Sequence, residues 1–126
     1  MGHCATFVAV NLNLLRSAAL FGFLGVVLGA FGAHALKTTL LAHGATDIWN
    51  KAVLYQLVHA VALLTMALHG TQNRGAFFAF VLGILIFSGS LYLLALTNLR
   101  WLGAITPIGG LCFLVGWAWL LITPGR

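Results

Sequence analysis

Four long apolar stretches fill almost the whole chain, and they leave few folds open to it. Of the 126 residues, 62% are hydrophobic and only 6% are charged, whereas a soluble domain has about 25% charged residues. A bilayer core about 30 Å thick needs roughly 20 apolar residues per helix. The sequence therefore predicts an all-α fold, an integral membrane four-helix transmembrane bundle without a soluble domain.

The few polar residues set the expected boundaries. Asn11, Asn13 and Arg16 interrupt residues 1–16, so we expect an N-terminal segment that lies along the interface or extends the first helix. The four spans are expected at about 17–36, 48–68, 76–97 and 102–122, followed by a tail at 123–126. No internal repeat relates these spans to one another.

Three local features suggest how the spans begin and connect. The segment from Lys37 to Asn50 is the longest polar stretch, and any lid or partner-binding loop is expected there. Asp47 is a good helix N-cap, so the second span is expected to begin directly after it. Pro107 removes one backbone hydrogen bond and is expected to kink the fourth span.

The charge of the chain is strongly basic, with six Lys and Arg against the single acid Asp47. Basic proteins often bind nucleic acid, but these cations stand singly at the ends of apolar runs. Membrane topology explains them better, and no nucleic-acid partner is expected. Three cations fall on each side of the predicted membrane, so the positive-inside rule does not orient the chain.

Four glycines in the first span recur at helical spacing. Gly22, Gly25, Gly29 and Gly32 fall within one narrow stripe, and small-residue stripes allow close helix packing where lipid supplies no hydrophobic drive. We interpret them as a helix-packing surface. The helix packed against them belongs either to this chain or to another, so the expected partners are the lipid bilayer and other membrane subunits or a homo-oligomer.

The strongest candidate for a binding site lies on the second span. Tyr55 and His59 share one helical face, with Gln56 beside them, and Ser88 and Tyr92 lie in the third span. Polar side chains within a span are costly and mark functional sites by default. The competing interpretation is structural: His59 is neutral and hydrogen-bonded to another helix, which it holds in place.

A cofactor is not expected, although two histidines raise the question. His34 and His59 on facing helices are suitable haem ligands in type. If Lys37 and Lys51 mark the same interface, however, His34 lies about 4.5 Å and His59 about 12 Å inside it at 1.5 Å per residue, whereas two haem ligands need similar depths. His34 also lies opposite the glycine stripe, so either it meets a different neighbour or the helix breaks at Gly32. No metal-ligand spacing and no set of catalytic groups is present, so no enzymatic activity is predicted.

Four ordered motifs resemble a known family. They are GAFGAHALK at Gly29–Lys37, Tyr55-Gln56 with His59-Ala60, Phe87-Ser88-Gly89-Ser90-Leu91-Tyr92, and Ile105-Thr106-Pro107-Ile108-Gly109-Gly110. The chain resembles the small membrane family catalogued as domain of unknown function 423, and animal transmembrane protein 256 is similar at a greater distance. The resemblance implies a four-span protein of the bacterial inner membrane, and it implies no established activity.

Two functions remain open from the sequence. The leading hypothesis is a non-catalytic accessory or structural subunit that packs through its glycine-rich helix against a larger membrane complex or its own copies. The alternative is a small transporter or binder of a lipid-like or small polar ligand that uses Tyr55, Gln56 and His59, with speculative ligand-binding contributions from His34, Ser88 and Tyr92.

Overall fold

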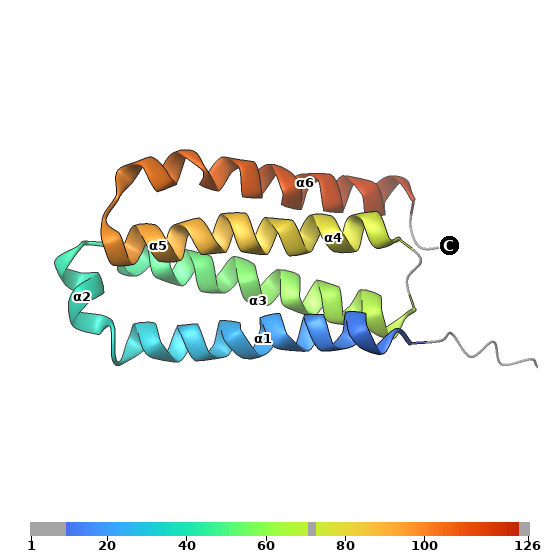
Figure 1. The fold of residues 1–126 in the computed structure, drawn as a ribbon, viewed down its shortest axis with the longest axis horizontal. Helices are drawn as coiled ribbons and strands as arrows, with labels where there is room; N and C mark the ends of the chain where they lie inside the picture. Colours follow the sequence, from blue (N-terminus) through green and yellow to red (C-terminus); the bar gives the residue numbers. More distant parts are fainter. Residues whose placement is uncertain (1–9, 71–72, 124–126) are drawn as a thin grey trace, which may run out of the picture.

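Four helical spans run side by side in the computed structural model, which describes residues 10–70 and 73–123 (Figure 1). The first span is α1 (Leu12–Ala33) and the second is α3 (Thr46–Leu68). The third span consists of α4 (Arg74–Gly83), the π-helical turn η1 (Ile84–Ser88) and α5 (Gly89–Thr97). The fourth consists of the 3₁₀ helix η2 (Arg100–Ala104) and α6 (Thr106–Ile122). A short helix, α2 (Lys37–Ala42), joins the first two spans. All four are long and apolar enough to cross a membrane, which confirms the predicted fold class.

The two central spans are α3 and the α4–η1–α5 span. Helix α1 packs mainly against α3, and α6 packs against the third span, so that α1 and α6 lie on the outer sides (Figure 1). The outer position leaves α1 the least covered, with 11% of its apolar window buried compared with 39% for α3. Most of the α1 surface is therefore free to meet lipid or another chain.

The first helix begins earlier and ends earlier than the sequence suggests. Asn11 caps it, because its side-chain oxygen accepts hydrogen bonds from the backbone N–H groups of Asn13 at 3.0 Å and Leu14 at 3.3 Å. The helix thus starts at Leu12, and residues 12–16 extend the first span, which is one of the two arrangements expected for them. Residues 1–9 of the expected interfacial segment lie outside the described residues.

The connection between the first two spans contains a short helix, since α2 occupies the first six residues of the segment from Lys37 to Asn50. Two local expectations about the helix starts are wrong. Asp47 lies in the first turn of α3, and the N-cap position is Ala45, which makes no side-chain cap. Pro107 lies in the first turn of α6, where a missing N–H breaks no intrahelical bond, so it starts this helix instead of kinking it.

The glycine stripe of α1 faces α3 of the same chain. A Cβ atom added at Gly25 would lie 2.6 Å from Leu57 Cδ2, one at Gly29 3.3 Å from Val53 Cγ1, and one at Gly32 2.3 Å from Trp49 Nε1. Gly22 differs, since a Cβ there would meet no atom within 4 Å. Three of the four glycines therefore permit close packing inside the chain, and Gly22 alone is open.

Two hydrogen bonds join the same pair of helices. Trp49 Nε1–H donates to the Leu28 carbonyl at 2.8 Å, and Gln56 Nε2–H donates to the Phe21 carbonyl at 2.9 Å. Each acceptor lies four residues before a glycine of the stripe. Because a helical side chain covers the turn that precedes its own Cα, a glycine at that position leaves the carbonyl open to a donor from outside the helix.

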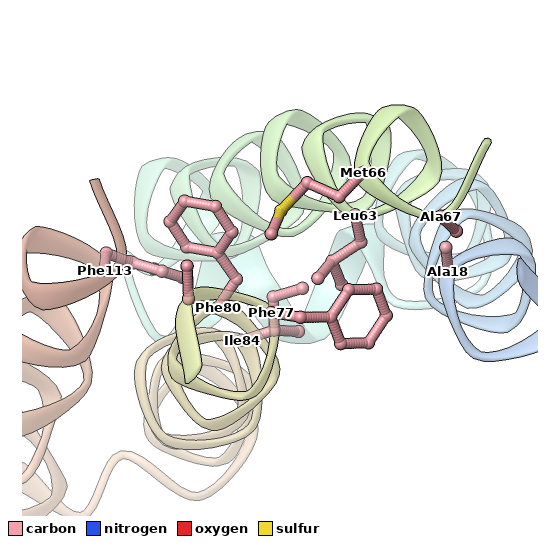
Figure 2. Packing of buried hydrophobic residues seen from close by; sticks show 9 residues of the cluster. Ala18, Leu63, Met66, Ala67, Phe77, Phe80, Ile84 and Phe113 are labelled. Carbon is pink, nitrogen blue, oxygen red and sulfur yellow. The ribbon is translucent and has the colours of Figure 1, made fainter. Parts of the chain in front are cut away.

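Apolar side chains fill the space between the spans on the inner side. Figure 2 shows Leu63 and Met66 of α3 above Phe77 and Phe80 of α4, with Ala18 of α1 at one side and Phe113 of α6 at the other. Lipid is as apolar as these side chains, so their close packing contributes mainly through van der Waals contact. This cluster holds both outer helices against the central pair.

We predict that Gly32→Ala destabilises the protein and that Gly22→Ala does not. The added methyl at residue 32 displaces the Trp49 indole and breaks its hydrogen bond, which should cost about 2 kcal/mol. At residue 22 the methyl meets open space, and the higher helix propensity of alanine should stabilise by up to about 1 kcal/mol. Unfolding in mixed detergent micelles, followed by circular dichroism, measures both, and equal stabilities would contradict the packing described.

Candidate functional site

Gln56 lies at the centre of a polar connection among three helices. Its side chain is 3% exposed. Its Nε2 group donates to the Phe21 carbonyl of α1, and its Oε1 atom accepts from the Tyr92 hydroxyl of α5 at 2.7 Å. Trp49 packs its ring against Tyr92 with centroids 4.7 Å apart. The amide thus has a partner at each end, and α1, α3 and α5 are held together.

His59 is also engaged on both sides of its ring. Its Nδ1 atom lies 2.7 Å from the Tyr55 carbonyl, and Trp117 Nε1–H donates to its Nε2 atom at 3.0 Å. A carbonyl only accepts and an indole N–H only donates. These partners require a neutral imidazole with its hydrogen on Nδ1, so neither ring nitrogen is free to bind a metal or accept another proton.

Aromatic rings surround the His59 imidazole. The Phe113 ring of α6 stacks on it with centroids 3.7 Å apart, and Phe80 of α4 approaches edge-on at 5.2 Å. Trp117 completes this shell with its ring at 5.8 Å. The imidazole, which is 4% exposed, is therefore fixed among rings from the third and fourth spans.

The serines of the third span form internal bonds as well. Ser88 is fully buried and donates to the Ala52 carbonyl of α3 at 2.8 Å. Ser90 and Thr106 lie 2.7 Å apart, oxygen to oxygen, which connects α5 to the start of α6. The π-helical turn that contains Ser88 packs tightly on α6, since a Cβ at Gly109 would lie 2.3 Å from the Phe87 nitrogen.

Tyr55 differs from the other polar side chains of the spans. Its ring packs against Phe87 at 4.5 Å and Phe113 at 6.1 Å, and it stacks near His59 at 6.3 Å. Its hydroxyl makes no hydrogen bond to any described residue, and 38% of the residue is exposed. It is thus adjacent to the imidazole, as its sequence position suggests, but it is not bonded to it.

His34 does not join this group. It caps the C-terminal end of α1 with its backbone N–H, which donates to the Ala30 and Phe31 carbonyls, and the residue is exposed. Gly32 lies beside Trp49, and His59 lies ten residues farther along α3, or about 15 Å. Within the described ranges no group of three His, Cys, Asp or Glu side chains is placed to hold a metal ion.

Three residues of the polar network have roles that the sequence reading missed. Trp49 lies near the start of its span, where tryptophan is typical of the membrane interface, yet it is 1% exposed and bonds to α1. Trp117 is not among the predicted site residues, although its indole N–H donates to His59. His43 of the connecting segment places Nδ1 2.9 Å from the Ala95 carbonyl, which lies in the last turn of α5 where carbonyls lack helical partners.

Comparisons with known proteins agree that the chain is similar to small membrane proteins of unknown function. The family model described as "Protein of unknown function (DUF423)" matches residues 28–110. The chain is 46% identical over 109 residues to the UPF0382 membrane protein SH2409 of Staphylococcus haemolyticus, covering 83% of this chain and 88% of that protein. It is 42% identical over 116 residues to the UPF0382 inner membrane protein YgdD of Escherichia coli K12, covering 86% of each. No solved structure matches the chain.

We predict opposite effects on stability from the same substitution at the two tyrosines. Tyr92→Phe leaves the buried Gln56 oxygen without its donor, which should lower the free energy of unfolding by about 1 kcal/mol. Tyr55→Phe removes a hydroxyl that has no internal partner, so the change in the isolated monomer should stay within about 0.5 kcal/mol. Unfolding in detergent measures both, and an equal loss at the two positions would contradict the network.

We also predict a single neutral tautomer for His59. In ¹⁵N spectra of the labelled protein in detergent, the hydrogen should be found on Nδ1, because the Tyr55 carbonyl and the Trp117 indole fix both ring nitrogens. Trp117→Phe should alter the Nε2 resonance and leave the Nδ1 hydrogen in place. An Nε2-protonated ring in the unaltered protein would rule out the hydrogen bond from Trp117.

Proposed function

The chain belongs to the DUF423 family of membrane proteins of unknown function, and we propose that it is a non-catalytic accessory or structural subunit. It packs through α1 against a larger membrane complex or its own copies. The observation that carries this proposal is the internal use of its polar groups. In the described part of the chain, no buried side-chain nitrogen or oxygen lacks a hydrogen-bond partner.

Internal bonding of this kind supports a structural role over catalysis. A general acid or base must reach its substrate with a free nitrogen or oxygen, and both His59 nitrogens are already bonded within the chain. Gln56 and Ser88 are bonded in the same way. The one acid of the sequence, Asp47, is an exposed residue in the first turn of α3, far from this set.

The same bonds weigh against the transporter or ligand-binding alternative. A ligand on Gln56 would have to displace either the Phe21 carbonyl or the Tyr92 hydroxyl, and a ligand on His59 would have to displace Trp117. Each displacement leaves a polar group unpaired in an apolar medium, which costs free energy. The accessory role requires no such rearrangement.

Helix α1 supports packing as its mode of action. It is the least buried span, and its outward side chains include Phe23 and Val26, which are 66% and 64% exposed. Gly22 lies near the middle of the helix with open space where a side chain would be. A neighbouring helix can approach closely at such a position. The Escherichia coli relative named as an inner membrane protein supports the inner membrane as the location.

We predict that Gly22→Leu weakens assembly while the fold persists. The leucine would fill the open space at residue 22 and keep a partner helix away. In membranes solubilised with a mild detergent, native electrophoresis and chemical crosslinking should show loss of the larger species. The substituted chain should unfold at the same denaturant concentration as the unaltered protein.

Gly25→Leu is the matched control. The same side chain at residue 25 collides with Leu57 of α3 and should destabilise the fold itself. If the Gly22→Leu chain assembles as strongly as the unaltered chain, the proposal that α1 is the contact surface is contradicted. A strictly monomeric protein with no copurifying chain would reject the accessory role.

A further inference from the structure

We propose that one face of α3 binds a phospholipid whose headgroup carries a primary ammonium group. Asp47, Lys51 and Tyr55 follow one another at intervals of four residues, and they meet the ammonium, the phosphate and an ester carbonyl of the lipid in turn. The site uses neither Gln56 nor His59, whose polar groups are bonded within the chain. It is also independent of packing through α1, so the two proposals can fail separately.

The three residues occupy one exposed face of α3. Residues four apart in a helix lie on the same face, and each such step advances about 6 Å along the axis. Asp47, Lys51 and Tyr55 are all exposed. Trp49 and Gln56 bond to α1, and at 3.6 residues per turn Lys51 lies almost opposite both of them. The face therefore meets lipid rather than α1.

None of the three polar side chains is used inside the chain. Asp47 and Lys51 are one turn apart, a spacing at which opposite charges can pair. No ion pair or hydrogen bond, however, joins the Asp47 carboxylate, the Lys51 ammonium or the Tyr55 hydroxyl to another described residue. The carboxylate and the ammonium are thus available to bind opposite charges from outside, and the hydroxyl is available to an outside acceptor.

The position of Lys51 sets the depth of this face. It is the last Lys, Arg, Asp or Glu of α3, and the apolar part of the helix follows it. A lysine at such a boundary places its ammonium among the lipid headgroups. Asp47 then lies one turn farther out and Tyr55 one turn farther in. Because a helical side chain points back toward the N-terminal end, the Tyr55 hydroxyl is directed toward this same boundary.

The order of the side chains matches the order of groups in one class of lipid. From water to the bilayer centre, phosphatidylethanolamine presents an ammonium, a phosphate, ester carbonyls and acyl chains. Helix α3 presents a carboxylate, an ammonium, a phenol and then apolar side chains. A carboxylate accepts from an ammonium, Lys51 donates to a phosphate, and the Tyr55 hydroxyl donates to a carbonyl. Each group thus meets its complement.

The single acid of the chain gives this face its selectivity. Asp47 is the one Asp or Glu of the sequence, and it lies at the level of the outermost lipid group. A phosphatidylglycerol headgroup has no cation there, so its net negative charge meets the carboxylate unfavourably. The quaternary ammonium of phosphatidylcholine has no N–H to donate. A primary ammonium is therefore the headgroup that Asp47 favours.

The lower part of the face is fixed before a lipid binds. The Tyr55 ring packs against Phe87 and Phe113, so little conformational entropy is lost when its hydroxyl donates to a ligand. Val58 lies one turn deeper on the same side of α3 and is 49% exposed. It provides apolar surface for the acyl chain that continues inward from the ester group.

The experiment compares three lipids on the unaltered full chain. The protein is reconstituted in vesicles that contain equal amounts of phosphatidylethanolamine, phosphatidylcholine and phosphatidylglycerol with identical acyl chains. It is then released with a mild detergent, and the retained lipid is identified by native mass spectrometry. Phosphatidylethanolamine should be retained about three- to fivefold over each of the other two, since an exposed charge pair contributes modestly.

Four variants test the role of each group. Asp47→Asn should remove the preference for phosphatidylethanolamine over phosphatidylcholine. Tyr55→Phe should lower retention of all three lipids about two- to threefold without changing the headgroup preference. The exchange Asp47→Lys, Lys51→Asp keeps the net charge but reverses the order of the two charges, and it should abolish the preference. Arg100→Gln is the matched control, because Arg100 is an exposed cation at the same end of the bundle (Figure 1), and it should change nothing.

Each outcome supports or overturns the lipid site. Equal retention of phosphatidylethanolamine and phosphatidylcholine by the unaltered chain overturns it without any variant. A preference that survives the exchange of Asp47 and Lys51 also overturns it. Stronger retention of phosphatidylglycerol, lost in Lys51→Gln, overturns it in favour of an anionic lipid on the lysine alone. Circular dichroism should show the same helix content in every variant, and none of these results bears on the Gly22→Leu test of α1.

Discussion

The contact between α1 and α3 is the interaction on which the rest of the arrangement depends. Trp49 and Gln56 are seven residues apart on α3, and the carbonyls that they reach, Leu28 and Phe21, are seven residues apart on α1. The two antiparallel helices are thus bonded at two matching levels. In lipid the hydrophobic effect does not drive helices together, so such bonds and close packing hold a helix that is otherwise largely uncovered.

This contact also positions the groups deeper in the protein. The Gln56 side chain is hydrogen-bonded both to α1 and to Tyr92 of α5, and Trp49 packs on the same tyrosine. One turn farther along α3, His59 connects to α6 through Trp117. Side chains of α3 thereby reach the three other spans, which explains why polar residues that resemble a binding site are used for assembly.

The sequence was sufficient to predict the fold but not the hydrogen-bond partners of the polar side chains. Span number and the glycine stripe could be predicted because hydropathy and helical spacing are local properties. Trp49 could not be recognised as a donor to α1, since a tryptophan near a span end is equally typical of the interface. Its acceptor is a backbone carbonyl, which has no residue type to reveal it. The capping role of Asn11, the π-helical turn before Gly89 and the placement of Pro107 likewise depend on neighbouring backbone.

The candidate site was predicted as a set of residues, and tertiary structure then gave its members different roles. Spacing placed Tyr55, Gln56 and His59 together on α3, but spacing cannot show which of them finds an internal partner. Gln56 and His59 form hydrogen bonds within the chain at both ends of their polar groups. The Tyr55 ring packs against Phe87 and Phe113 on one side, and its hydroxyl has no hydrogen-bond partner among the described residues.

The two tyrosines show why this distinction bears on function. The Tyr92 hydroxyl donates to the buried Gln56 amide, which would be costly to leave unpaired. The stability of the fold is therefore a sufficient reason for a tyrosine at residue 92. A phenylalanine at residue 55 would pack equally well against Phe87, because the Tyr55 hydroxyl has no hydrogen-bond partner among the described residues. The Tyr55 hydroxyl is thus not committed to the fold of the single chain, whereas that of Tyr92 is.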